Sequence, residues 1–221
     1  MFTGFTDETV DFMWGIRFNN ERAWFEAHKD TYLTQFYQPM RELGDELYDF
    51  IRDKRPNAGL IRKVSRIYRD ARRLYGRGPY KSHLWFSLRM AGEHWAEQPV
   101  FWFEIYPEGY SYGLGIYQAL PATMARFRQA VDRDPREMRK LAQAFQAQDR
   151  FRLEAEEYKR PKGCPEPPLD QWYNRKSLDL TCSRPADDLL YSPALVGELT
   201  EAFESLMPYH RYFSALCLRA D

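Results

Sequence analysis

Residues 100–117 read VFWFEIYPEGYSYGLGIY, and this stretch decides the fold class of the chain. Aromatic and aliphatic side chains recur through 100–106 and 110–117, and the tripeptide PEG separates the two runs. Two such runs joined by a short turn are typical of a β-hairpin. Gly113 and Gly115 leave one face of the second strand bare, which favours close approach of a helix or aromatic ring over a ligand. We therefore expect an antiparallel sheet that contains this hairpin.

Further strands are expected on both sides of the hairpin. In residues 82–90 every second side chain from position 84 onward is apolar, the alternation of a strand with one buried face. Strand-like patterns also occur in 61–69 and 176–183. Glycine and proline mark a loop in 70–79, between the first two strands. Together with the hairpin these segments predict about five strands.

Helices are expected at both ends of the chain. A short helix should begin after Thr6, whose hydroxyl suits a helix start, and end at Gly15. Apolar residues then recur with helical spacing from about residue 20 to 50, where Pro39 predicts a kink or a restart. Helical patterns also occur in residues 124–131, 141–145 and 185–218. The fold prediction is α+β, an antiparallel sheet of about five strands with N-terminal and C-terminal helices packed on one face.

Composition favours one domain over residues 1–221, because a single core of this size is ordinary and 44% of the residues are hydrophobic. The beginning of the chain lacks the pattern of a signal peptide, and no stretch is long and apolar enough for a membrane span. Three cysteines without a CxxC pair favour a reduced, cytoplasmic setting, with Cys164 as the most accessible thiol. Four scattered histidines predict no metal site, and no motif indicates a cofactor.

The net charge of zero hides a segregation of charge. Residues 54–89 contain eleven basic side chains and one acid, Asp70, a local net charge of +10. Such a segment favours anionic partners, although a neutral chain is a poor candidate for tight, non-specific binding of nucleic acid.

Five segments together resemble a known family. In chain order they read FNNERAWFEAHK at 18–29, RIYRDAR at 66–72, PYKSH at 79–83, KRPKG at 159–163 and RKS at 175–177. In this combination the chain resembles the microbial family called domain of unknown function 2461, from about Phe5 to Pro208. The resemblance implies one α+β domain and no established activity. The positions Arg73, 74–78 and Cys164 depart from the family's pattern, so any role of theirs would be particular to this protein.

The candidate ligand site follows from the basic segment and the matched motifs. If the two strands around the loop pair, their polar side chains converge on one region. Arginine offers a planar donor fork and lysine a point charge, and together they suit phosphate or carboxylate. The ligand-binding candidates are Arg66, Tyr68, Arg69, Asp70, Arg72, Tyr80, Lys81, His83, Arg175 and Lys176.

The leading hypothesis is a cytoplasmic protein that binds a small anionic ligand at this strand-loop-strand site. Catalytic residues remain unassigned, with His83 and Glu104 as weak candidates for proton transfer, and the sequence leaves open whether the protein is an enzyme. Glu104 stands among aromatic residues, where burial would raise its pKa unless Arg66 or Lys81 paired with it. Surface exposure of Glu104 is the simpler alternative.

Two other classes of function stay open. The basic segment 61–89, interleaved with Tyr68, Tyr75, Tyr80 and Trp85, could bind nucleic acid by backbone contacts and stacking, although no recognised motif supports this. Alternatively, the protein is a structural or protein-interaction module in which Arg66, Asp70 and Arg72 form an internal ion-pair network. The oligomeric state is open.

Overall fold

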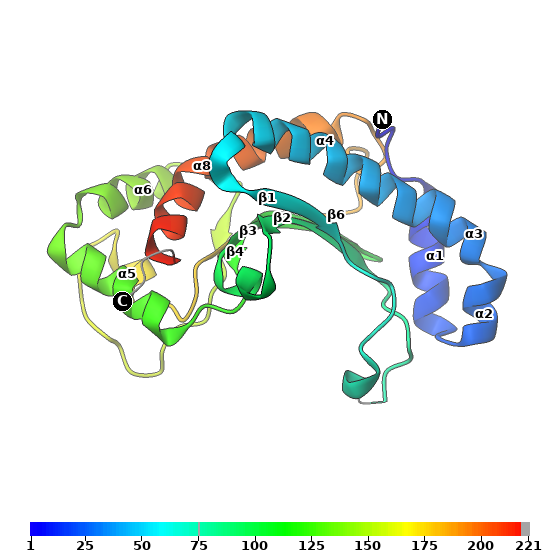
Figure 1. The fold of residues 1–221 in the computed structure, drawn as a ribbon, viewed down its shortest axis with the longest axis horizontal. Helices are drawn as coiled ribbons and strands as arrows, with labels where there is room; N and C mark the ends of the chain where they lie inside the picture. The colour runs from blue at the N-terminus through cyan, green and yellow to red at the C-terminus, as the bar shows by residue number, and fades with distance from the viewer. Residues whose placement is uncertain (75, 218–221) are drawn as a thin grey trace. The chain divides into compact units, whose positions relative to one another are not determined.

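The computed structural model describes residues 1–74 and 76–217 (Figure 1). Within them, six strands form one antiparallel sheet in the order β1-β2-β3-β4-β6-β5. The strands are β1 (Leu60–Val64), β2 (Leu84–Met90), β3 (Pro99–Tyr106), β4 (Gly109–Ile116), β5 (Arg152–Leu153) and β6 (Asp179–Pro185). The predicted hairpin is confirmed as β3 and β4. Strand β5 is additional to the five predicted strands. It has two residues, too few to show an alternating pattern in the sequence.

The helices follow the predicted segments with two main differences: residues 170–173 form a short helix that was not predicted, and the last helix begins at Leu195 and not near Pro185. They are α1 (Asp7–Phe18), α2 (Arg22–Ala27), α3 (Lys29–Thr31), α4 (Gln38–Lys54), α5 (Pro121–Arg133), α6 (Arg136–Gln146), α7 (Asp170–Tyr173) and α8 (Leu195–Cys217), with a π-helical segment η1 (Tyr32–Tyr37) before α4. Pro39 lies in the first turn of α4, as predicted. The prediction that Gly15 ends the first helix is wrong: Gly15 lies inside α1, and a side chain there would overlap with the indole of Trp24. None of the helices in the described ranges is both long and apolar enough to cross a membrane.

Helices from both ends of the chain pack on the same face of the sheet, which confirms that part of the fold prediction. A methyl group at Gly44 of α4 would lie 3.3 Å from the ring of Phe86, so the helix backbone approaches β2 closely. Phe86 stacks on Phe103 with ring centroids 5.6 Å apart. On the same face of β3, the ring of Phe101 lies 5.1 Å from that of Phe203 in α8. Aromatic packing of this kind stabilises the core beyond its burial of area.

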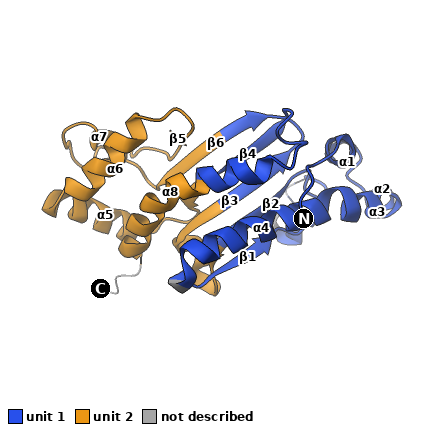
Figure 2. Cartoon of the chain, turned by 90° about the horizontal axis from the view of Figure 1, so that it is seen from above, with its two compact units in different colours: residues 1–88, 102–112, 183–202 blue, residues 89–101, 113–182, 203–221 orange. Residues whose placement is uncertain are grey.

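The chain divides into two compact units (Figure 2). Unit 1 consists of residues 1–88, 102–112 and 183–202, and unit 2 of 89–101, 113–182 and 203–221. The core of unit 1 includes the fully buried side chains of Phe2, Phe25, Phe36, Phe86 and Phe103. That of unit 2 includes Phe101, Phe127, Trp172, Phe203 and Phe213.

The bare face at Gly113 and Gly115 is covered by a neighbouring strand, in contrast to the expected helix or aromatic ring. A Cβ atom at Gly113 would overlap with the backbone oxygen of Leu180, and one at Gly115 with the carboxylate of Asp179. Both contacts come from β6, which pairs beside β4. The glycines therefore serve the packing of the sheet within unit 2.

Candidate functional site

The basic segment forms an extended arm of unit 1. Beyond the pair β1 and β2, the backbone of Arg69 donates to Pro79 and that of Lys81 donates to Ile67, each at 2.8 Å. Tyr68 and Tyr80 form an antiparallel bridge between these two stretches. The strand-like pairing around the loop is therefore confirmed, although β1 itself ends at residue 64 and β2 begins at residue 84.

Packing against the N-terminal helices fixes the base of this arm. The side chain of Asn20 accepts a hydrogen bond from the backbone of Tyr80 and donates one to its carbonyl oxygen, both at 2.9 Å. The Tyr80 ring is only 3% exposed and stacks on Phe25 with ring centroids 4.4 Å apart. Tyr68 is 51% exposed and meets the edge of the Phe25 ring. Of these two candidates, Tyr80 is thus placed in the core and Tyr68 at the surface.

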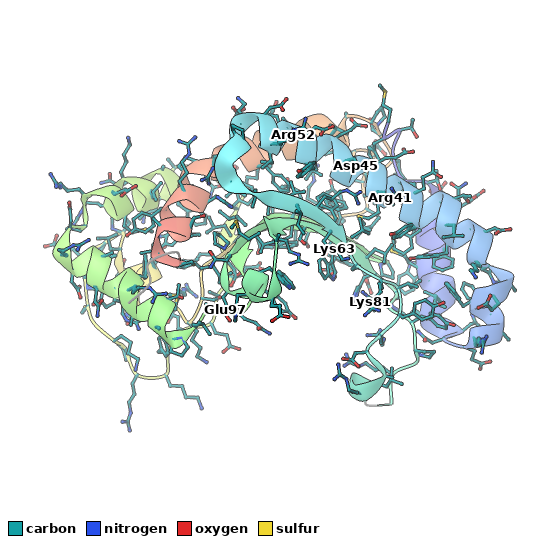
Figure 3. The ribbon with its side chains drawn as sticks, viewed as in Figure 1. Arg41, Asp45, Arg52, Lys63, Lys81 and Glu97 are labelled. Atoms are coloured by element: carbon teal, nitrogen blue, oxygen red, sulfur yellow. The ribbon has the colours of Figure 1, made fainter. Side chains whose placement is uncertain are left out.

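Three cationic side chains gather on the arm: Arg66, Arg69 and Lys81, which we call the cation cluster. Arg66 is exposed, whereas the other two are half-buried. In the described ranges, 1–74 and 76–217, none of the three has a carboxylate oxygen within 4.0 Å. Figure 3 labels Lys81 where the arm joins the sheet. The guanidinium Nε of Arg69 donates to the carbonyl oxygen of Tyr80 at 2.9 Å, which holds its fork in place.

The cations of the cluster repel one another. Burial is the main cause that lowers the pKa of Lys81 to about 8; the charges of Arg69 and Arg66 contribute to this shift, and the charge of Glu104 opposes it. Burial likewise lowers the pKa of Arg69, with a contribution from Arg77. Since a lowered pKa means that the charged form is disfavoured, the folded protein holds these charges at a cost.

His83 and Glu104 lie beside the cluster. His83 is the residue before β2, and Glu104 lies on β3. His83 Nδ1 is 3.8 Å from Glu104 Oε1, too far for a hydrogen bond, and the two side chains are 34% and 32% exposed. Burial and then the charges of Lys81, Arg69 and Arg17 lower the pKa of His83 to about 4, so its imidazole is neutral at neutral pH. Burial raises the pKa of Glu104, and the charge of Lys81 opposes this. Glu104 is therefore half-buried, in contrast to the simpler alternative of surface exposure, and a cation acts on it as an attraction from Lys81 without a direct ion pair.

This arrangement can bind an anion and move a proton. A neutral imidazole accepts a proton, and a lysine with a pKa of about 8 can donate one near neutral pH. A guanidinium fork and an ammonium group can both donate to phosphate or carboxylate oxygens.

The other predicted basic residues are engaged by carboxylates. Arg72 forms two hydrogen bonds with Asp70, at 3.0 and 3.1 Å, and its side chain is 88% exposed. Asp70 also accepts a bond from the backbone of Arg72 and so begins the short 3-10 turn at Ala71–Arg73. The internal ion-pair network predicted as an alternative therefore exists for Asp70 and Arg72, and Arg66 takes no part in it.

Arg175 and Lys176 belong to unit 2, where each has an acidic partner. Arg175 Nη2 lies 3.3 Å from Glu157, and its Nη1 donates to the carbonyl oxygen of Ala155 at 2.6 Å. Lys176 Nζ lies 2.7 Å from Glu156. These contacts tie residues 155–157 to the segment before β6.

Arg17 belongs to the charge environment of His83, and no pattern in the sequence indicates this. It lies in the last turn of α1 and forms a bidentate pair with Glu108 in the hairpin turn, and this pair lowers the pKa of Glu108. Since Arg17 and Glu108 are 91 positions apart, no local pattern could bring them together.

Two further predictions concern thiols and metals. Cys164 is exposed, Cys182 is buried, and Cys217 is half-buried, with burial raising its pKa to about 11. Cys164 is thus the most accessible thiol, as predicted. Among the residues that the structure describes, no group of three or more His, Cys, Asp or Glu side chains could hold a metal ion.

The chain matches the model of a protein family over most of its length. Residues 8–212 match the model of a conserved hypothetical protein family, DUF2461. This confirms the resemblance seen in the motifs. A search of the curated proteins found no match.

Proposed function

This chain belongs to the DUF2461 family, and we propose that its unit 1 binds a small anionic ligand, bearing phosphate or carboxylate, at the cation cluster. The observation that carries the proposal is the absence of a carboxylate within 4.0 Å of Arg66, Arg69 and Lys81 in the described ranges. By contrast, the half-buried Arg62 of the same unit has a carboxylate partner in Asp45. A cluster of cations that repel one another, two of them half-buried, is stabilised when an anion binds.

Each member of the site has a distinct part in this proposal. The fork of Arg69, held by the carbonyl oxygen of Tyr80, offers oriented donors. Lys81 supplies a point charge, and the exposed Arg66 attracts the ligand from solvent. His83 and Glu104 stand beside the bound anion, where a neutral imidazole can accept a proton.

Thermal unfolding with a panel of phosphates, nucleotides and organic acids tests the proposal on the wild type and on Arg69→Ala. An anion present at a hundred times its dissociation constant should stabilise the wild type by about 2.7 kcal/mol. The ligand-induced shift should be lost in Arg69→Ala. It should persist in the control Arg72→Ala, because Arg72 is already paired with Asp70. If no anion stabilises the wild type selectively, the proposal is wrong.

The alternative of nucleic-acid binding gains no support from the arm. Of the four aromatic residues considered for stacking, Tyr80 is buried under Phe25, and Tyr75 lies outside the described residues. Binding through several phosphates must weaken steeply with salt. A strong, salt-dependent affinity for single or double strands would therefore replace the small-ligand proposal with this one.

We also propose a single domain and a cytoplasmic setting. Strands β3, β4 and β6 each contribute residues to both compact units, which supports treating 1–221 as one domain. Cys164, Cys182 and Cys217 are all free thiols, which supports a reducing compartment. Denaturant unfolding followed by two probes tests the first statement, since one domain should unfold in a single cooperative step with coincident transitions.

A further inference from the structure

Three hydroxyl groups form a continuous row across neighbouring strands of unit 1. The phenol of Tyr106 in β3 lies 3.1 Å from Ser111 Oγ in β4. Ser111 Oγ in turn lies 2.9 Å from Ser183 Oγ in β6. Both distances are those of hydrogen bonds between hydroxyls. We call these residues the hydroxyl row.

The hydroxyl row continues the proposed anion site along the same face of the sheet. Glu104 and Tyr106 are two positions apart on β3, so their side chains point the same way, roughly 7 Å apart. Glu104 is itself in contact with His83 at 3.8 Å, and it attracts Lys81. Polar groups thus follow one another from β2 through β3 and β4 to β6, all within unit 1.

The two ends of the row are accessible and its middle is buried. Ser183 is exposed, Tyr106 is half-buried and Ser111 is buried. Each hydroxyl can donate one hydrogen bond and accept two, so a row of three retains a donor and several acceptor positions after its two internal bonds. The central serine therefore orients the outer two hydroxyls, which keep hydrogen-bonding capacity toward solvent.

We propose that the anionic ligand of this site is a polyol, a sugar phosphate or sugar acid whose hydroxyls bind the hydroxyl row. This inference rests on the proposed function and names its ligand class. The charged group would lie at the cation cluster, and the ligand hydroxyls would extend past Glu104 toward Ser183. Three strand spacings separate β2, which the cation cluster adjoins, from β6, roughly 14 Å, a span that a hexose phosphate covers together with the side chains that reach toward its two ends. Hydroxyls and a carboxylate recognise the donors and acceptors of a polyol, whereas an apolar tail would leave them unsatisfied.

Matched pairs of probes test the ligand class. Ribose 5-phosphate is compared with ethyl phosphate, and gluconate with hexanoate, by calorimetric titration of the wild type. The phosphate pair and the carboxylate pair separate the two sources of the anionic group. In at least one pair the polyol should bind about tenfold more tightly than its hydroxyl-free counterpart, the effect of one or two added hydrogen bonds.

Variants of the row then show whether it causes this preference. In the double variant Tyr106→Phe, Ser183→Ala, the ratio of the affinity for the polyol to that for its hydroxyl-free counterpart should fall close to one. The affinity for ethyl phosphate or hexanoate should stay unchanged. Ser183→Ala alone, at an exposed position, should lower the ratio in part, and Ser183→Thr should retain it. These single variants keep the test valid if the double variant folds poorly.

The outcomes separate the two proposals. If the paired probes bind equally well to the wild type, or if the double variant keeps the preference, the hydroxyl row only links the strands and this inference is wrong, while anion binding stands. If neither ethyl phosphate, hexanoate nor inorganic phosphate binds and the polyols do not either, the proposed function fails together with this inference.

Discussion

Two basic regions of the chain are alike in sequence and differ in their surroundings. The cation cluster of unit 1 lies on an extended arm, and its three charges have no carboxylate within 4.0 Å in the described ranges. In unit 2, Arg175 and Lys176 each contact a glutamate, at 3.3 and 2.7 Å. Both regions belong to motifs that resemble the family pattern, and only one has unneutralised charge.

This difference separates a binding site from a structural contact. A surface ion pair such as that of Lys176 gains little free energy, yet it leaves no electrostatic reason for a ligand. Burial, together with the charges of Arg69 and Arg66, lowers the pKa of Lys81 to about 8, and that cost persists until an anion binds or a proton leaves. Variants of the two regions test whether they differ in this way.

The largest effect is expected from removing the charge at position 81. Lys81→Met should abolish the stabilisation by a bound anion, about 2.7 kcal/mol when the ligand is at a hundred times its dissociation constant. The matched variant Lys176→Met should retain it, because that lysine already pairs with Glu156. Thermal unfolding with and without inorganic phosphate measures both. Equal responses of the two variants would show that the two regions do not differ.

Without any ligand, the free energy of unfolding of Lys81→Met should depend on pH differently from that of the wild type. Lys81 has a folded pKa of about 8 and an ordinary value of 10.5. Between these values the unfolded chain holds more protons, so this lysine makes the free energy of unfolding rise with pH. The wild type should therefore gain about 1 kcal/mol relative to Lys81→Met between pH 8 and 10, after a discount for partial exposure.

Denaturant unfolding at several pH values checks this prediction. Taking the difference from the variant removes the contribution of Tyr32 and Tyr110, whose raised pKa values affect both proteins in the same pH range. A constant difference across the range would show that Lys81 titrates normally.

A smaller effect is expected from Glu104. The negative charge of its carboxylate attracts Lys81, and the same charge would repel an anion bound at the cluster. Glu104→Gln should therefore tighten the binding of inorganic phosphate by about threefold, measured at pH 6.5, where Lys81 remains protonated. Weaker binding in this variant would mean that Glu104 holds the ligand rather than opposing it.

The smallest effect is expected in unit 2. Lys176→Met removes an exposed ion pair with Glu156, and we expect no measurable change in the unfolding midpoint or in phosphate affinity. Circular dichroism at increasing temperature checks the first. A large destabilisation would show that the pair fixes the segment before β6.

The sequence predicted the sheet well where side chains alternate over several residues. The hairpin, the apolar face of β2 and the restart at Pro39 are local patterns, and the structure confirms them. Strand β5 was not predicted because its two residues are too few to show an alternating pattern of apolar side chains. The end of α1 was placed wrongly at Gly15, because the reason for that glycine is the distant ring of Trp24.

For the site, the sequence predicted which residue types gather and left their pairing open. Arg66, Arg69, Arg72 and Lys81 are equivalent in a list of basic residues. Only the fold shows that Arg72 is paired with Asp70 while the other three have no acidic partner in the described ranges. The sequence offers Arg66 and Lys81 as possible partners of Glu104, and the structure shows an attraction to Lys81. Arg17 was not among the predicted site residues. Contacts between residues far apart in the chain decide these points.

The pKa of Lys81 is the most direct test of the proposed anion site, measured by NMR on protein with labelled lysine side chains, with and without inorganic phosphate. We predict that Lys81 titrates at about 8 in the free protein and shifts upward by at least about one unit when phosphate is bound. A value near 10.5 in the free protein, or one that phosphate leaves unchanged, would contradict the claim that the cation cluster is an unneutralised anion site.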